Sequence, residues 1–151
     1  MSGGPVRVVE AGAATDEVVA ALARLIPQLS ASAAVPSRAA VEEVVGSPST
    51  RLLLARDAAD GIVGTLTLVL VRTPAGVRAT IEDVVVDAAA RGRGAGEALT
   101  REAIRMARAA GARSVDLTSR PGREAANRLY ARMGFGPRET NLYRLPLDDG
   151  G

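Results

Sequence analysis

The fold is decided by the stretch Ile81-Glu82-Asp83-Val84-Val85-Val86-Asp87-Ala88-Ala89-Ala90-Arg91-Gly92-Arg93-Gly94-Ala95-Gly96-Glu97-Ala98-Leu99. Its valine-rich beginning predicts a buried strand, its arginine- and glycine-rich middle a turn, and its alanine-rich end a long helix. A helix N-terminus presents backbone N–H groups without partners and a partial positive charge. Glycines at alternate positions let a ligand approach that backbone closely. The stretch therefore predicts a pyrophosphate site where the strand meets the helix.

Spacing excludes two common phosphate-binding loops. A P-loop requires a lysine after its second glycine, but all 19 basic residues of this chain are arginine. The dinucleotide fingerprint requires Gly-x-Gly-x-x-Gly. Here Gly92, Gly94 and Gly96 are spaced Gly-x-Gly-x-Gly, and Glu97 stands where the last glycine should be. A nucleotide-binding regulatory domain is disfavoured for the same reason.

The pattern that remains is Arg-x-x-Gly-x-Gly after a valine-rich strand, formed by Arg91, Gly94 and Gly96. This pattern resembles the acetyl-CoA site of the GNAT acetyltransferase superfamily, in which the backbone amides of the loop hold the pyrophosphate of the cofactor. The resemblance implies a small, single-domain, bacterial-type member of that superfamily.

A second motif further along the chain strengthens the resemblance. In GNAT proteins the equivalent helix carries an asparagine and, three residues later, a tyrosine, followed by Gly-Phe; here these are Asn127, Tyr130 and Gly134-Phe135. Residues three apart share one helix face, so both side chains can reach a ligand beside the helix. The two motifs extend the resemblance from Ile62 to Leu147.

Length and composition set outer limits. A chain of 151 residues fits one domain with its own core. Hydrophobic residues make up 47% of the chain but aromatic residues only 2%, so Val, Leu, Ile and Ala must pack that core. We expect a cytoplasmic protein without membrane association, because the sequence has neither a run of about 18 apolar residues nor a signal-peptide pattern. The formal net charge is only +2, which gives no indication of nucleic-acid binding.

Missing residue types limit the chemistry. Without histidine, the chain can hold no Ser-His-Asp triad, histidine base or histidine metal site. Without cysteine, it has no thiol nucleophile, disulfide or thiolate zinc site. Without lysine, Schiff-base chemistry is excluded. Catalysis must rely on carboxylates, tyrosines, hydroxyls, backbone dipoles and water, and no metal is expected.

Periodicity and turn residues predict an antiparallel meander followed by alternating strands and helices. The expected strands are Val6–Val9, Arg51–Arg56, Ile62–Arg72, Val77–Val86, Val115–Thr118 and a last short pair, one from Gly134-Phe135 through Arg138 and the other from about Asn141 to Leu147. The expected helices run from Thr15 to about Ile26, Ser37 to Val45, Gly94 to Ala110 and Glu124 to Met133.

With the resemblance, these elements give an α+β (mixed α/β) GNAT fold. It has a central, mostly antiparallel twisted sheet of about six or seven strands with about four helices on both faces, splayed between the fourth and fifth strands. Residues 1–151 are expected to form a single N-acetyltransferase domain with a core of about residues 5–147.

The resemblance implies acetyl-CoA as co-substrate and a set of residues that bind it. The backbone of Val84 to Val86 bonds the pantetheine arm like an added strand, and an N–H there faces the thioester oxygen as an oxyanion donor. Arg91 and Arg93 lie near the phosphates, although plain surface solvation is the alternative for Arg93. The complete set is Val84, Val85, Val86, Arg91, Gly92, Arg93, Gly94, Ala95, Gly96, Glu97 and Asn127.

Tyr130 is the candidate acid for the leaving thiolate. A tyrosine with a pKa of about 10 still carries its proton at neutral pH and can protonate a thiolate. The alternative is that Tyr130 only packs its helix against the sheet. Tyr143, on the expected last strand, suits the core or the wall of the substrate site.

Glu82 is the candidate base, because it lies beside the transfer point and no histidine can take that role. Strand alternation turns Glu82 and Asp83 to opposite faces, so only one faces the site unless a bulge intervenes. Two alternatives stay open: the carboxylates form ion pairs outside the site, or ordered water relays the proton.

The acceptor is expected to be a primary amine, first a small molecule and second a protein N-terminus or lysine. In this superfamily the acceptor site is built mainly by the first helices and the loop between them, here Ile26 to Pro36, which is uncharged from Pro27 to Ser37. The Ile-Glu-Asp tripeptide at Glu82 resembles that of some amino-sugar acetyltransferases. Without a cysteine to carry the acetyl group, we expect direct transfer in a ternary complex, by a monomer or homodimer. A non-catalytic acyl-CoA sensor is the alternative from another class.

Overall fold

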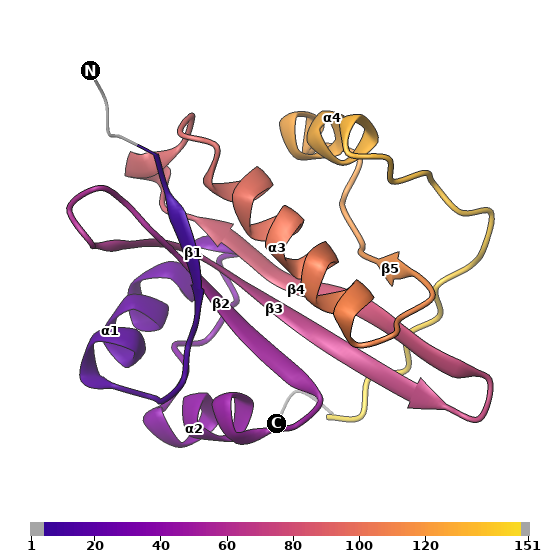
Figure 1. The fold of residues 1–151 in the computed structure, drawn as a ribbon, viewed down its shortest axis with the longest axis horizontal. Helices are drawn as coiled ribbons and strands as arrows, with labels where there is room; N and C mark the ends of the chain where they lie inside the picture. The colour runs from indigo at the N-terminus through magenta and orange to yellow at the C-terminus, as the bar shows by residue number, and fades with distance from the viewer. Residues whose placement is uncertain (1–4, 149–151) are drawn as a thin grey trace. The chain divides into compact units, whose positions relative to one another are not determined.

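The computed structural model describes residues 5–148 (Figure 1). The chain divides into two compact units, Met1–Thr118 and Ser119–Gly151, which are described separately below. The single domain therefore stays a prediction. In chain order the elements are β1 Arg7–Glu10, α1 Asp16–Leu25, η1 Ile26–Gln28, α2 Arg38–Gly46, β2 Thr50–Arg56, β3 Ile62–Thr73, β4 Gly76–Val86, η2 Ala88–Ala90, α3 Ala95–Ala109, β5 Val115–Asp116 and α4 Glu124–Arg132, where η marks a 3-10 helix.

The first unit contains a sheet of five strands in the order β1-β2-β3-β4-β5. Neighbouring strands are antiparallel from β1 to β4, and β5 runs parallel to β4. The expected mixed α/β class with a mostly antiparallel sheet is therefore confirmed. The strand number is lower than expected, because the last pair of strands is missing from the described residues.

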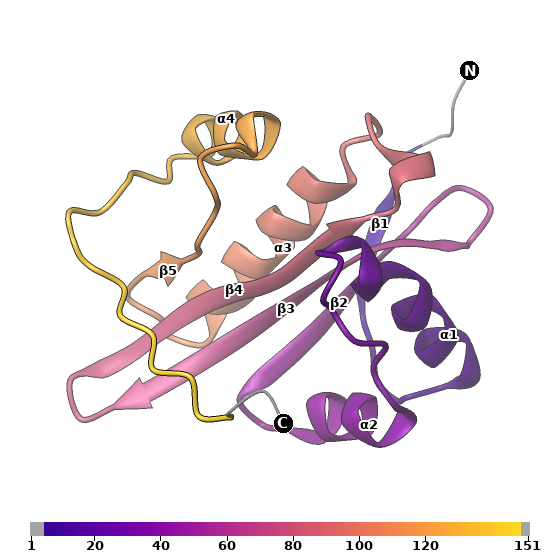
Figure 2. The same cartoon turned by 180° about the vertical axis from the view of Figure 1, so that it is seen from behind.

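Helices cover both faces of this sheet (Figures 1 and 2). On one face, Val18, Leu22 and Leu25 of α1 and Val41 of α2 form one buried cluster with Leu52, Leu54, Ile62 and Val85 of the sheet. On the other face, α3 turns Leu99, Ala103 and Ala107 inward, each at most 1% exposed. Aliphatic and alanine side chains thus fill the core, as the composition predicts.

Local signals explain where the first two helices begin. The hydroxyl of Thr15 accepts a hydrogen bond from the amide of Val18, and that of Ser37 from the amide of Ala40, so both residues are N-caps. α1 ends at Leu25, and Pro27 lies in the first turn of the 3-10 helix η1 that follows it. The predicted beginnings of α1 and α2 are confirmed within one residue.

A bulge interrupts the pairing of β3 with β4. Thr65 lies opposite Val85 and Thr67 opposite Glu82, so Leu66 alone faces the two residues Asp83 and Val84. Asp83 has a φ of +51°, which is uncommon for a residue with a side chain. One extra residue on β4 shifts the alternation of its side chains beyond this point.

The second unit contains one helix, α4, and extended chain. Gly134, with a φ of +101°, ends the helix, and the Tyr130 carbonyl accepts the amide of Phe135 at 3.0 Å. The rings of Tyr130 and Phe135 meet edge to face, with centroids 5.7 Å apart. The Gly-Phe pair of the second motif is therefore the stop signal of its helix.

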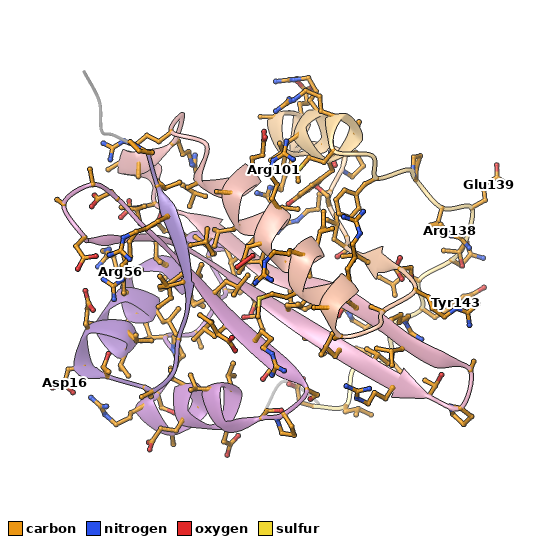
Figure 3. The ribbon with its side chains drawn as sticks, viewed as in Figure 1. Asp16, Arg56, Arg101, Arg138, Glu139 and Tyr143 are labelled. Atoms are coloured by element: carbon orange, nitrogen blue, oxygen red, sulfur yellow. The ribbon has the colours of Figure 1, made fainter. Side chains whose placement is uncertain are left out.

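The expected last pair of strands is wrong for the described residues. No strand forms after α4 up to residue 148, and β5 ends at Asp116 rather than Thr118. Pro137 and Pro146 lack an N–H group to donate, which weakens any pairing of this segment. Leu142, Tyr143, Leu145 and Leu147 are all exposed, and Figure 3 shows Tyr143 pointing outward beside Arg138 and Glu139. Tyr143 is therefore not part of the core.

Candidate functional site

The strand-to-helix stretch folds as a short loop at the end of β4. Asp87 caps η2, and residues 91–94 then lead into α3. Gly92 and Gly94 have φ values of +86° and +77°, and a Cβ at either would have no atom within 4 Å. The backbone therefore requires glycine for its conformation and not for lack of room. The space next to this backbone is open to a ligand.

The amides of this loop are available as donors. The first hydrogen bond of α3 runs from the amide of Ala98 to the carbonyl of Gly94, at 3.0 Å. Within residues 5–148, no protein group accepts a hydrogen bond from the amides of Gly92 to Gly96. A diphosphate supplies several anionic acceptors, so the donor set fits that group.

The charged side chains of the loop have different partners. Arg91 is exposed. Arg93 lies 4.0 Å from the Asp57 carboxylate, and both side chains are about one-fifth exposed. Glu97 binds Arg101 one turn along α3, at 2.8 Å, as their spacing predicts. Arg93 fixes the loop to the β2–β3 turn, where Asp57 also accepts the amides of Ala59 and Gly61.

One edge of β4 is open beside the loop. On the side of β4 away from β3, only Ala79 and Thr80 pair with β5, and within residues 5–148 no strand pairs with residues 81–86 on that side. Val84, Val85 and Val86 therefore lie on an edge to which an extended arm could add. The expected splay between the fourth and fifth strands is present in this form.

Gly64 fixes the other side of β4. A Cβ at this residue would lie 3.1 Å from the Val85 carbonyl oxygen and 3.3 Å from Cδ1 of Leu99. The absence of a side chain thus allows β3, β4 and α3 to pack closely behind Val85.

The bulge decides where the two candidate carboxylates lie. Directly paired residues share a face, so Glu82 lies on the same face as Thr67, Thr65 and Val85, which is the face covered by α1 and α2. Regular alternation would have put Glu82 and Val85 on opposite faces. Glu82 and Asp83 are both exposed, so neither is withdrawn into the core.

The second motif is held by contacts within its own unit. Tyr130 is buried, and loss of hydration raises the pKa of its hydroxyl above the ordinary value of 10.0, with Arg123 opposing the shift. The Asn127 side-chain amide donates to the carbonyl of Arg120 at 2.9 Å. Tyr130 therefore keeps its proton at neutral pH, as an acid must, while Asn127 orders the turn before its helix.

Sequence reasoning missed three residues next to the loop. Asp57 holds Arg93, and Arg24 and Gln28 reach the end of β4 from α1 and η1. Only the Asp57-to-Gly61 turn has a local signal, since an Asp side chain often bonds backbone amides of its own turn. Arg24 and Gln28 act across long sequence separations that no local pattern encodes.

The sequence matches the family described as "Acetyltransferase (GNAT) family" over residues 13–135. The chain belongs to this family. The match includes both motifs of this GNAT protein and ends at Phe135, so the exposed C-terminal segment lies beyond it.

Individual relatives agree with this assignment. Glucosamine 6-phosphate N-acetyltransferase 1 of Oryza sativa subsp. japonica is 38% identical over 110 residues, which are 70% of this chain and 65% of the rice protein. A candidate acetyltransferase from Agrobacterium tumefaciens str. C58 superposes with a TM-score of 0.80 at 27% identity, over 92% of this chain and 99% of that one. A transcriptional regulator from Bacillus halodurans C-125 superposes with a TM-score of 0.77 at 27% identity, over 93% and 99%.

Proposed function

We propose that this GNAT protein is an N-acetyltransferase that moves an acetyl group from acetyl-CoA to a primary amine. The observation that carries the proposal is the pair of open features at the end of β4: unpaired amides from Gly92 to Gly96, and a strand edge without a partner at Val84 to Val86. The first suits the diphosphate of coenzyme A and the second suits its pantetheine arm. Arg91 is the cation that remains exposed beside the diphosphate.

Each proposed step has a residue in this chain. A backbone N–H at Val84 to Val86 stabilises the oxyanion as the amine nitrogen attacks the thioester carbon. Glu82, directly or through water, takes the proton of the amine. The C–S bond then breaks, and Tyr130 gives its proton to the departing thiolate. Removal of one oxyanion donor costs about 3 kcal/mol in other enzymes, so the backbone contribution is a large one.

Direct transfer in a ternary complex follows from composition. The chain has no cysteine, so no thiol can hold the acetyl group between two half-reactions. Direct transfer requires both substrates to be bound together. A covalent acetyl-enzyme trapped during turnover would contradict this mechanism.

The acceptor that we propose is a small amine, with amino sugars as the first class to test. The rice relative is described as acting on glucosamine 6-phosphate. The residues from Pro27 to Ser37 are uncharged, which disfavours strong electrostatic selection of a phosphate by that segment. A panel of glucosamine, glucosamine 6-phosphate and a lysine peptide separates these acceptors. A protein N-terminus or lysine is the second candidate.

One observation favours a different function. The Bacillus halodurans neighbour is described as a transcriptional regulator, so the same fold occurs under a regulatory description. A non-catalytic acyl-CoA sensor would bind coenzyme A but release no thiol with any amine. The buried, protonated Tyr130 favours the enzyme.

The deciding experiment follows thiol release from acetyl-CoA. Because the protein has no cysteine, a thiol reagent detects free coenzyme A without background from the chain. We expect release that depends on the amine, together with calorimetric binding of coenzyme A. Binding without release supports the sensor, and absence of binding overturns both functions.

We further propose that the protein works in the cytoplasm as a monomer or homodimer. None of the helices in residues 5–148 has the length and apolar character needed to cross a membrane. Sedimentation at several concentrations measures the oligomeric state.

A further inference from the structure

We call residues 91–94, which connect η2 to α3, the diphosphate loop. Two side chains, one from α1 and one from η1, reach the turn that leads into it. Arg24, in the last turn of α1, donates from Nη2 to the Ile62 carbonyl at 2.6 Å and from Nε to the Asp87 carboxylate at 3.4 Å. Gln28, in η1, accepts the amide of Ala88 at 3.1 Å through Oε1. Its Nε2 donates to the Arg24 carbonyl at 3.2 Å, which joins the two contacts into one network.

This network holds the turn that leads into the loop. The Asp87 amide continues the sheet by donating to Val63 at 2.8 Å, and the Asp87 carboxylate accepts the amide of Ala89 at 3.2 Å. Gln28 and Asp87 therefore cap two consecutive amides of η2, those of Ala88 and Ala89. Asp87, which caps the amide of Ala89, directly follows β4, whereas Gln28, which caps the amide of Ala88, lies in η1.

The segment that follows η1, residues 29–37, is fixed at both ends by arginines. Arg24 ties the η1 end to the sheet and to Asp87, whereas Arg38 ties the α2 end to the carbonyl of Ala14, at 2.7 Å, and to Asp16. The two arginine side chains are equally exposed, at 50% and 49%. Only the first of these two anchors touches the turn that leads into the diphosphate loop.

We propose that Arg24 and Gln28 are positioning residues that couple the diphosphate loop to residues 29–37. This inference rests on the proposed function, because it assumes that coenzyme A binds the loop. A diphosphate that accepts hydrogen bonds from the loop amides restricts the motion of η2. The contacts of Gln28 and Arg24 extend this restriction to η1. Coenzyme A thus orders residues 29–37, which we expect to help form the acceptor site, before the amine arrives, and by reciprocity the amine tightens coenzyme A.

The test measures amide hydrogen exchange of residues 29–37 with and without saturating coenzyme A. In the wild-type protein we expect slower exchange with coenzyme A, by about fivefold or more, the lower range of measured couplings. In Gln28→Met and Arg24→Met the coenzyme should still bind, but the slowing should disappear. Gln28→Glu keeps an acceptor for the Ala88 amide and should retain most of it.

Arg38→Met is the matched control. It also removes one arginine bond to a backbone carbonyl and one to an aspartate, but at the end of the segment away from the loop. Its exchange should be faster with and without coenzyme A, and the slowing ratio should stay at the wild-type value. A purely structural role for Arg24 and Gln28 would give the same behaviour in their variants.

The outcomes are distinct. Slowing in the wild type that is lost in Gln28→Met and Arg24→Met but kept in Arg38→Met supports the coupling. Coenzyme A binding without slowing, or slowing that persists in Gln28→Met and Arg24→Met, overturns the coupling and leaves the proposed function standing. Calorimetry that finds no binding of coenzyme A to the wild type overturns the proposed function, and the coupling with it.

Discussion

The two motifs of the site belong to regions of very different construction. The diphosphate loop is flanked by Ala90 and Ala95, which are 3% and 2% exposed, and Leu99 in the next turn of α3 is 0% exposed. Arg93 connects the loop to the β2–β3 turn through Asp57. Among residues 119–148, by contrast, Tyr130 is the one buried residue. Its ring meets the Phe135 ring edge to face, and Gly134 ends its helix.

This difference suggests separate sources of binding and turnover. The loop joins β4 to α3 of a sheet with helices on both faces, and the residues at its two ends are buried. The tyrosine lies on the short helix α4 of the other unit. We expect changes in the first region to alter affinity or stability, and changes in the second to alter the rate with affinity retained. Five predictions follow from it, beginning with the largest effect.

Tyr130→Phe should lower kcat by about a hundredfold or more, the ordinary contribution of a positioned acid. The dissociation constant for coenzyme A should stay within about twofold of wild type, because the loop is unchanged. Steady-state kinetics and calorimetry measure both. Tyr143→Phe, which alters the exposed tyrosine, is the matched control and should behave as wild type.

The same variant has a pH test. Burial raises the pKa of Tyr130 above 10.0, so its acid form persists past pH 10.0 and is lost only as the pH rises through the higher value. The wild-type rate should fall in that alkaline range, and the rate of Tyr130→Phe should not. An equal alkaline fall in both proteins would assign the titration to another group.

Gly64→Ala should destabilise the first region by about 2 kcal/mol, the usual cost of overpacking. The added methyl would stand against the Val85 carbonyl and Leu99, at 3.1 and 3.3 Å. Denaturant unfolding measures the loss, with Gly12→Ala, where a Cβ meets no atom within 4 Å, as control. Equal stability of the two variants would mean that the packing behind β4 is loose.

Gly94→Ala should weaken coenzyme A binding about tenfold, since a left-handed φ costs a side chain roughly 1–2 kcal/mol and the loop must shift to relieve it. Gly111→Ala is its counterpart at the other end of α3, with a φ of +81° and equally open surroundings. Both variants should lose similar stability, but only Gly94→Ala should lose affinity. A similar loss of affinity in both would contradict a site at the loop.

Glu17→Gln should have the smallest effect. The bidentate contact with Arg56 holds the pKa of Glu17 below its ordinary value of 4.5. Its contribution to stability is therefore present above pH 4.5 and is lost as the pH falls through the lower folded value. The variant should unfold in acid with a shallower pH dependence than wild type, and bind coenzyme A normally. Glu43→Gln, at an exposed position of α2, is the control.

The parts of this molecule that follow from the sequence are those with local causes. Thr15 and Ser37 cap their helices by contacts three residues away, and Gly92 and Gly94 adopt the conformations that only glycine accepts readily. The β4–loop–α3 succession was therefore predictable, as was the antiparallel meander before it.

What the sequence did not reveal depends on distant partners. The bulge at Asp83 is defined by its register against Leu66, and Arg93 finds Asp57 from another turn. In the C-terminal segment the error is of the opposite kind, because the sequence predicts strands that do not form in the described residues. Its alternating apolar residues predict strands, but a strand needs a neighbour, and Leu145 and Leu147 have none within the described residues. Composition alone cannot supply that neighbour.

The single additional residue in β4 also has an evolutionary consequence. Deletion of the codon for Asp83 would remove a left-handed residue and restore a regular ladder, so selection for folding alone would favour it. The same deletion would leave Glu82 on its present face, because Val85, Val84 and Glu82 would then pair in unbroken register with Thr65, Leu66 and Thr67. The extra residue is therefore not needed to set the face of the proposed base. What it changes is the backbone of β4 at Asp83 and Val84, where we propose that the pantetheine arm and the oxyanion bind.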